Sequence, residues 1–119
     1  MAGQSFPRSA RLRSSSEFRV LKEKGKVYHG KLMVLSLLQN PTGGISRVGF
    51  ITSRRVGGAV QRNRARRMMR EAVRHDLARL PQNLLLVLIG RTKVAAATLD
   101  AVQSDWRELL AKAHIHLNS

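Results

Sequence analysis

The clearest alternation of apolar and polar positions lies between residues 47 and 53. Val48 and Phe50 face one way there and Ile51 the other, because a period of two places successive side chains on opposite faces of a strand. The preceding segment, 26–38, is rich in Val, Leu and Met and ends at the turn-forming run Asn-Pro-Thr-Gly-Gly. We therefore predict that 26–38 and 47–53 are strands joined by a hairpin.

A different kind of apolar segment occupies residues 84–89. All six of its residues are apolar, without alternation, and Gly90 follows them. Such a run is typical of an interior strand that is covered on both faces. We predict a buried strand here.

Three further segments have the three- and four-residue spacing of helices. The first, 15–24, begins at a capping-box pattern formed by Ser14 and Glu17 and stops at Gly25. The last begins after Thr98, whose hydroxyl can cap the N-terminus, and continues to about residue 113 with apolar residues on one face. Both patterns predict helices that pack against the sheet.

The longest helical segment, 59–79, follows Gly57-Gly58 and ends before Pro81. At about 100° per residue its apolar side chains occupy one side of the helix and its arginines the other. The apolar residues are Ala65, Met68, Met69, Ala72 and Val73, and the arginines are Arg64, Arg66, Arg67, Arg70 and Arg74. One face is therefore predicted to pack and the opposite face to meet a partner.

Taken together, these elements predict an α+β fold in which three helices cover a small mixed β-sheet, in the order α-β-β-(β)-α-β-α. We expect one domain over 14–116. Residues 1–13 have no period and several Arg and Ser residues, so we expect a flexible basic tail. Its composition also resembles an organelle transit peptide, and both interpretations stay open.

The composition narrows the possible classes of protein. A chain of 119 residues is long enough for one core, and its longest apolar run is far shorter than the ~20 residues of a membrane helix. The chain has no Cys, which excludes disulfides and thiolate metal sites and fits a reducing compartment, so we expect a cytoplasmic protein. The net charge of +15 favours a polyanionic partner, nucleic acid before a membrane surface.

The positive charge is concentrated in the first two thirds of the chain. Residues 1–79 contain 18 of the 22 basic side chains, and the segment 54–74 contains eight arginines with one acid, Glu71. A solvated helix face normally alternates acids with bases at i,i+4, and this segment does not. Planar guanidinium groups favour paired contacts with phosphate, which indicates nucleic-acid binding.

One continuous segment, RVGFITSRRVGGAVQRNRARRMMR at 47–70, joins the end of a strand, a glycine turn and the start of a basic helix. It closely resembles the bacterial ribonuclease P protein subunits. Their hallmark is an Arg-Asn-Arg core, here Arg62, Asn63 and Arg64, preceded by a Ser, two basic residues and a Gly turn. The resemblance extends, less specifically, over residues 11–112.

This resemblance implies a protein that joins a catalytic RNA in the endonuclease that removes 5′ leaders from precursor tRNA. The RNA would carry out the chemistry with Mg²⁺ held on its own phosphates, and the protein would have no catalytic residue and no metal site. The family fold is an α+β sandwich with a left-handed strand-helix-strand crossover, an exception to the usual handedness. The implied partners are the catalytic RNA and the precursor tRNA leader, with one protein monomer per RNA and no membrane.

The resemblance also implies two groups of site residues. The RNA-binding group is Arg54, Arg55, Arg62, Asn63, Arg64, Arg66, Arg67 and Arg70, and the leader-binding cleft is Phe18, Lys22, Val34, Ser36, Ile51 and Ser53. Many relatives have aromatic residues where this chain has Lys22 and Ser36. Phe18 has an equally good interpretation as a core residue beneath the first helix.

Two other functions remain as alternatives. One is a ribosomal-type or chaperone-like RNA-binding protein without a ribozyme partner. The other is an independent metallonuclease that uses His75 and Asp76, although the seven acids are scattered along the chain. His114 and His116 are expected in a fraying terminus and make no convincing site.

Overall fold

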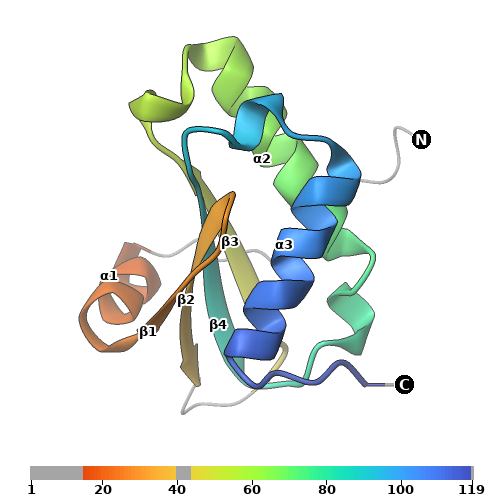
Figure 1. Cartoon of the computed structure of the whole chain (residues 1–119). Coiled ribbons are helices and arrows are strands. Elements are labelled where there is room, and N and C mark those ends of the chain that lie inside the picture. The colour runs from red at the N-terminus through yellow and green to blue at the C-terminus, as the bar shows by residue number, and fades with distance from the viewer. Residues whose placement is uncertain (1–14, 40–43, 119) are drawn as a thin grey trace.

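The computed structural model describes residues 15–39 and 44–118, which form a four-stranded sheet with helices on both faces (Figure 1). The predicted α+β fold with three helices is confirmed. The three α-helices and four strands are α1 (Ser15–Lys24), β1 (Lys26–His29), β2 (Met33–Gln39), β3 (Arg47–Thr52), α2 (Ala59–Arg74), β4 (Leu84–Gly90) and α3 (Leu99–Lys112). Short 3-10 helices cover Arg54–Val56, Leu77–Arg79 and Val94–Ala96.

The strand order is β1-β2-β4-β3, which makes the predicted hairpin between 26–38 and 47–53 wrong. β2 pairs antiparallel with β4, and β3 pairs parallel with β4 through the crossover helix α2. The hairpin lies instead inside the first segment, where β1 and β2 pair across a turn after His29. The physical reason is that β4 is the strand with two apolar faces, so it takes the interior place between β2 and β3.

A buried carboxylate explains why 26–38 breaks into two strands. Asp105, on α3, is 4% exposed and accepts hydrogen bonds from the backbone N–H groups of Lys31, Leu32 and Met33 at 2.8, 3.0 and 3.0 Å. The Gly30 N–H also donates to the Met33 carbonyl at 2.8 Å. Asp105 lies on a helix with little net charge, and no sequence pattern predicted this long-range contact.

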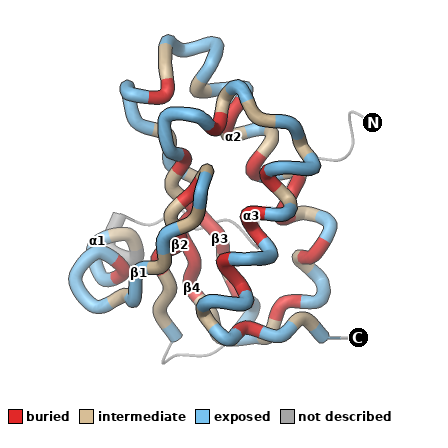
Figure 2. The backbone as a smooth tube through the Cα atoms, viewed as in Figure 1, coloured by how far each residue is buried: buried red, intermediate tan, exposed pale blue. Residues whose placement is uncertain are grey.

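The prediction for 84–89 is confirmed, since β4 is the interior strand and residues 85–88 are buried (Figure 2). Alternate side chains of β4 enter two apolar layers. Leu86 and Leu88 join α2, α3 and Trp106 in the larger core, and Leu85 and Val87 pack with Leu21 of α1.

The helix boundaries follow the predictions at every end except the C-terminal end of α2. α1 spans the predicted 15–24, although Ser14 of the expected capping box lies outside the described residues. In α3 the Thr98 hydroxyl accepts a hydrogen bond from the Ala101 N–H at 3.1 Å, as expected of the cap. α2, however, ends at Arg74 rather than at residue 79, because Asp76 turns inward.

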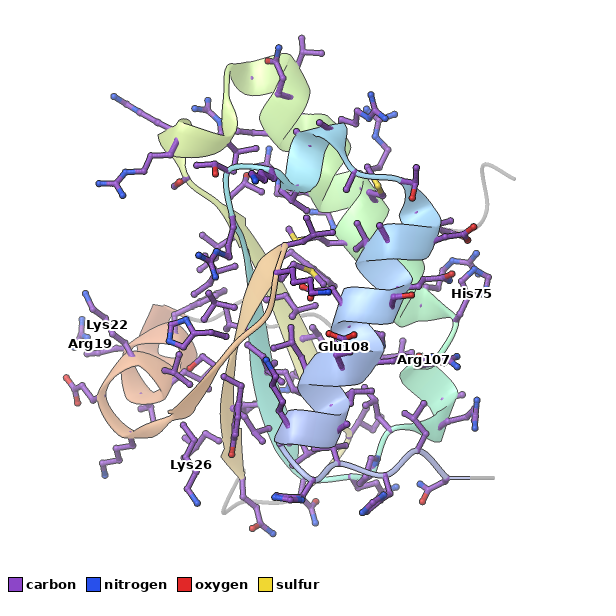
Figure 3. All side chains as sticks on the ribbon, viewed as in Figure 1. Arg19, Lys22, Lys26, His75, Arg107 and Glu108 are labelled. Atoms are coloured by element: carbon purple, nitrogen blue, oxygen red, sulfur yellow. The ribbon has the colours of Figure 1, made fainter. Side chains whose placement is uncertain are left out.

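Asp76 is the second buried carboxylate. It is 2% exposed and accepts hydrogen bonds from Trp106 Nε1 at 3.0 Å and from Arg107 at 2.8 and 3.2 Å. Figure 3 shows Arg107 pointing from α3 toward this turn. The contact joins the end of α2 to α3 and fixes the angle at which α2 leaves the sheet.

The expected fraying after α3 is also wrong over the described residues. Ile115 is buried in the larger core, and the Asn118 N–H donates to the Arg79 carbonyl at 2.6 Å. The predicted tail, residues 1–13, lies outside the described residues. None of the described helices is long and apolar enough to cross a membrane.

Candidate nucleic-acid interface

The arginine segment begins at the end of β3, where the chain turns sharply into α2. The Ser53 hydroxyl accepts a hydrogen bond from the Arg55 N–H at 3.3 Å and starts the short 3-10 helix that presents Arg54 and Arg55. Gly57 follows with a φ of 144°, a conformation that disfavours other residues. A Cβ there would also lie 2.9 Å from the Cβ of Gln61. The Gly turn therefore sets the start of α2.

One row of α2 arginines lies toward β3. Arg66 donates to the Thr52 hydroxyl at 2.9 Å and also to the Asn63 side chain. Arg62 reaches the Gly57 carbonyl at 3.4 Å, and the guanidinium of Arg70 lies 6.0 Å from the centre of the Phe50 ring. These contacts orient the row before any partner binds.

A second row lies farther around the exposed side of α2, away from β3. Arg64 and Arg67 are exposed and make no hydrogen bond or ion pair within residues 15–39 and 44–118. At 100° per residue they lie about 160° from Arg62 and about 100° from Arg66, respectively. Around the helix Arg70 and Arg74 lie between Arg66 and Arg67, so the two rows are parts of the one predicted basic face. The apolar arc of α2 lies opposite, buried between the sheet and α3.

Glu71, the one acid of this segment, is held within the helix. Arg74 donates to both of its carboxylate oxygens, at 2.5 and 3.0 Å, and His75 Nε2 lies 3.3 Å away. The hydrogen bond from Arg74 is the main cause that lowers the pKa of Glu71 below its usual 4.5. Glu71 lies one turn from Arg67, but its carboxylate is bonded by Arg74, and it makes no ion pair with Arg64 or Arg67.

On the opposite face of the sheet, α1 covers a cleft of about 300 Å³, here called the α1 cleft. It contains four of the six predicted leader-binding residues. Its lining is Phe18, Leu21, Lys22, Val27, Ser36, Ile51, Val87 and Ile89. Apart from Lys22 and the buried Ser36 hydroxyl, the walls are apolar.

Two predicted cleft residues, Val34 and Ser53, are absent from this lining. Val34 lies toward the β1–β2 turn, opposite His29 and Ile89, and Ser53 caps the 3-10 helix instead. Sequence reasoning missed the other four lining residues, Leu21, Val27, Val87 and Ile89. Strand alternation places Val87 on the α1 face, but Val27 could be found only once the β1–β2 hairpin was known.

Lys22 and Arg19 project from the same side of α1 (Figure 3). Lys22 lines the α1 cleft and is exposed, at a place where the resemblance led us to expect an aromatic residue in many relatives. A lysine there supplies charge in place of a stacking surface. Phe18 is half-buried and packs against Leu21, Leu85 and Val87 while also lining the cleft, so its two interpretations are compatible.

Over the described part of the chain, no group of three or more histidine and acidic side chains comes together. Asp76 is held by Trp106 and Arg107, which removes it from the pair proposed for a metallonuclease. His75 lies outside, next to Glu71. Asp76 therefore has a structural role in this fold.

The sequence of this chain is similar to those of a known protein family. The family model described as Ribonuclease P matches residues 6–114. The ribonuclease P protein component of Chloroflexus aurantiacus is 41% identical over 107 residues, covering 89% of this chain and 78% of the relative. That of Dehalococcoides mccartyi is 39% identical over 105 residues, covering 88% and 85%.

Solved structures agree with the fold. The RNase P protein from Thermotoga maritima superposes with a TM-score of 0.74 at 26% identity, covering 86% of this chain and 96% of that protein. The Staphylococcus aureus RNase P protein gives a TM-score of 0.80 at 22% identity, covering 89% and 96%. The second likeness concerns the fold alone.

Proposed function

The chain belongs to the ribonuclease P protein family. From this we propose that it acts as the protein subunit of ribonuclease P, the endonuclease that removes 5′ leaders from precursor tRNA. The observation that carries the function is the family match over residues 6–114, which includes the whole strand-turn-helix arginine segment. Family membership does not favour the ribosomal-type alternative.

The arginine segment is proposed to bind the catalytic RNA. Arg54, Arg55 and the arginines of α2 offer guanidinium groups along the β3–α2 connection and the successive turns of the helix, and phosphate is the anion that such planar donors contact best. Arg66 is held by Thr52 and Asn63, so little side-chain freedom is given up when it binds. Asn63, which lies between Arg62 and Arg64 in the sequence, helps to orient Arg66.

The α1 cleft is proposed to bind the single-stranded leader. Its apolar walls and its volume of about 300 Å³ suit a nucleobase, and Lys22 lies where it can contact the adjacent phosphate. In single-strand binders, stacking on an aromatic residue contributes about 1–3 kcal/mol per base. With only Phe18 available to stack among the residues that line it, this cleft would rely more on charge and less on stacking.

The chemistry is proposed to take place on the RNA subunit, with Mg²⁺ bound to RNA phosphates. The protein then contributes electrostatics, because its positive charge lowers the repulsion between the leader and the catalytic RNA. We further propose a cytoplasmic complex with one protein monomer per RNA, and a basic tail at residues 1–13 that adds to phosphate binding.

Reconstitution tests this function. The full chain is added to a bacterial ribonuclease P RNA at a Mg²⁺ concentration where the RNA alone is slow, and cleavage of precursor tRNA is followed. We expect a large rise in the cleavage rate, and equal rates with and without the chain would reject the proposal. Cleavage by the chain without RNA, abolished in His75→Ala, would instead support the metallonuclease.

A further inference from the structure

The two arginine rows of α2 face different surroundings. Arg62, Arg66 and Arg70 contact β3 and its flanking turn, whereas Arg64 and Arg67 border a groove between α2 and the start of α3. The first turns of α2 extend beyond the sheet, beside the 3-10 helix Val94–Ala96 (Figure 1). The second row therefore lies on a surface that the first row does not share.

This α2–α3 groove has a volume of about 640 Å³ and a lining that is half apolar and half charged or polar. It is lined by Val60, Arg64, Arg67, Met68, Glu71, Ala97, Thr98 and Leu99. Val60 is 78% exposed and offers an apolar surface at the edge of the groove. The Thr98 hydroxyl is occupied by the cap of α3.

The charges of the groove select an anionic occupant. Arg64 and Arg67 have no partner within the described residues, and Glu71, the one acid that lines the groove, is held by Arg74. An occupant with an apolar flat part and an adjoining negative charge matches this arrangement. A nucleotide has both, since the faces of its base are apolar and its phosphates lie at the edge.

We propose that the α2–α3 groove holds one unpaired base of the ribonuclease P RNA, with its neighbouring phosphates on Arg64 and Arg67. The inference rests on the proposed function and adds a second contact, separate from the row along β3. Met68 and Leu99 would contact the base, and Val60 would be covered by it. The groove would thus recognise an unpaired nucleotide, not a regular duplex.

A variant that fills the groove without changing charge tests the proposal. Ala97→Leu places three additional carbon atoms in the groove, and Ala111→Leu adds the same atoms at an exposed position of α3 outside it. The full-length variants are titrated with ribonuclease P RNA at several salt concentrations. We expect Ala97→Leu to bind about tenfold more weakly than Ala111→Leu, with an unchanged dependence on salt because every arginine that reaches a phosphate is retained.

Removing the exposed apolar side chain provides a second variant that does not threaten folding. Val60→Ser should weaken binding of the RNA by roughly threefold, again with an unchanged salt dependence. Ultraviolet cross-linking of the wild-type complex should attach an RNA base to a peptide that contains Met68 or Leu99. If Ala97→Leu fails to fold, the Val60→Ser titration and the cross-link decide.

The outcomes separate this proposal from the proposed function. If the wild-type chain activates the RNA but both groove variants bind the RNA as Ala111→Leu does, the groove holds no base and this inference is wrong. The same result is expected if the groove holds an acidic peptide instead of a base. A weaker affinity accompanied by a smaller salt dependence would mean that the groove binds phosphate alone, which also overturns the inference. A wild-type chain that neither binds nor activates the RNA would reject the function itself.

Discussion

At the scale of single residues, the two buried aspartates fix parts of the fold that the arginine segment depends on. Asp105 accepts three backbone N–H groups of the β1–β2 turn, and a buried N–H without its acceptor costs about 1–3 kcal/mol. Asp105→Ala should therefore lower the free energy of unfolding by about 3 kcal/mol or more. Urea denaturation measures this, and the exposed Asp100→Ala is the control. Similar losses of stability for both variants would contradict the assigned role.

Arg66 is held in position by hydrogen bonds to Thr52 and Asn63. Arg66→Ala should weaken binding of ribonuclease P RNA by about tenfold, as expected when a charge-assisted hydrogen bond of roughly 1.4 kcal/mol is removed. Arg66→Lys should recover only part of this, because an ammonium lacks the planar fork. Lys24→Ala, at the end of α1, is the matched removal of one charge. Equal affinities for the wild type and Arg66→Lys would show that charge alone matters.

The Glu71–Arg74 pair makes the stability of the folded chain depend on pH. Because Arg74 lowers the pKa of Glu71 below 4.5 in the folded chain, the stabilisation is present above pH 4.5 and is lost as the pH falls through the lower folded value. Both side chains are partly exposed, so the effect should be small. Wild type should exceed Glu71→Gln in stability at about pH 7, and urea denaturation should show the difference shrinking in acid. A difference that grows with falling pH would contradict this sign.

At the scale of elements, the turn between β3 and α2 determines where the arginines begin. Gly57 has a φ of 144°, and its added Cβ would meet the Cβ of Gln61, so Gly57→Ala should cost about 1–3 kcal/mol. Gly58, with a φ of −72°, is the control, since an alanine there would approach only the flexible end of Gln61. Thermal unfolding of both variants checks this. Comparable melting temperatures would show that the turn tolerates a side chain.

The same elements show what sequence patterns can and cannot predict. Helix positions and the interior strand followed from local periodicity, because each is decided by which of its own faces is apolar. The division of 26–38 into β1 and β2 did not, since it depends on Asp105 reaching a turn more than 70 residues away. Likewise, four of the residues that the resemblance implied line the α1 cleft. Val27 lines it too, but only because β1 and β2 form a hairpin, which the composition of 26–38 does not indicate.

At the scale of the whole molecule, the arginines on the two sides of α2 should act as separate phosphate contacts. Removal of one phosphate contact reduces the slope of log affinity against log salt by about 0.7–0.9. We expect Arg62→Ala/Arg66→Ala and Arg64→Ala/Arg67→Ala each to reduce the slope for ribonuclease P RNA, and the fourfold variant to show the sum, because the two pairs share no contact in the structure. Fluorescence titrations between about 0.1 and 0.5 M salt, where screening changes strongly, measure the three slopes. A fourfold variant no different from either double variant would mean that both rows meet the same phosphates, which would contradict separate contacts.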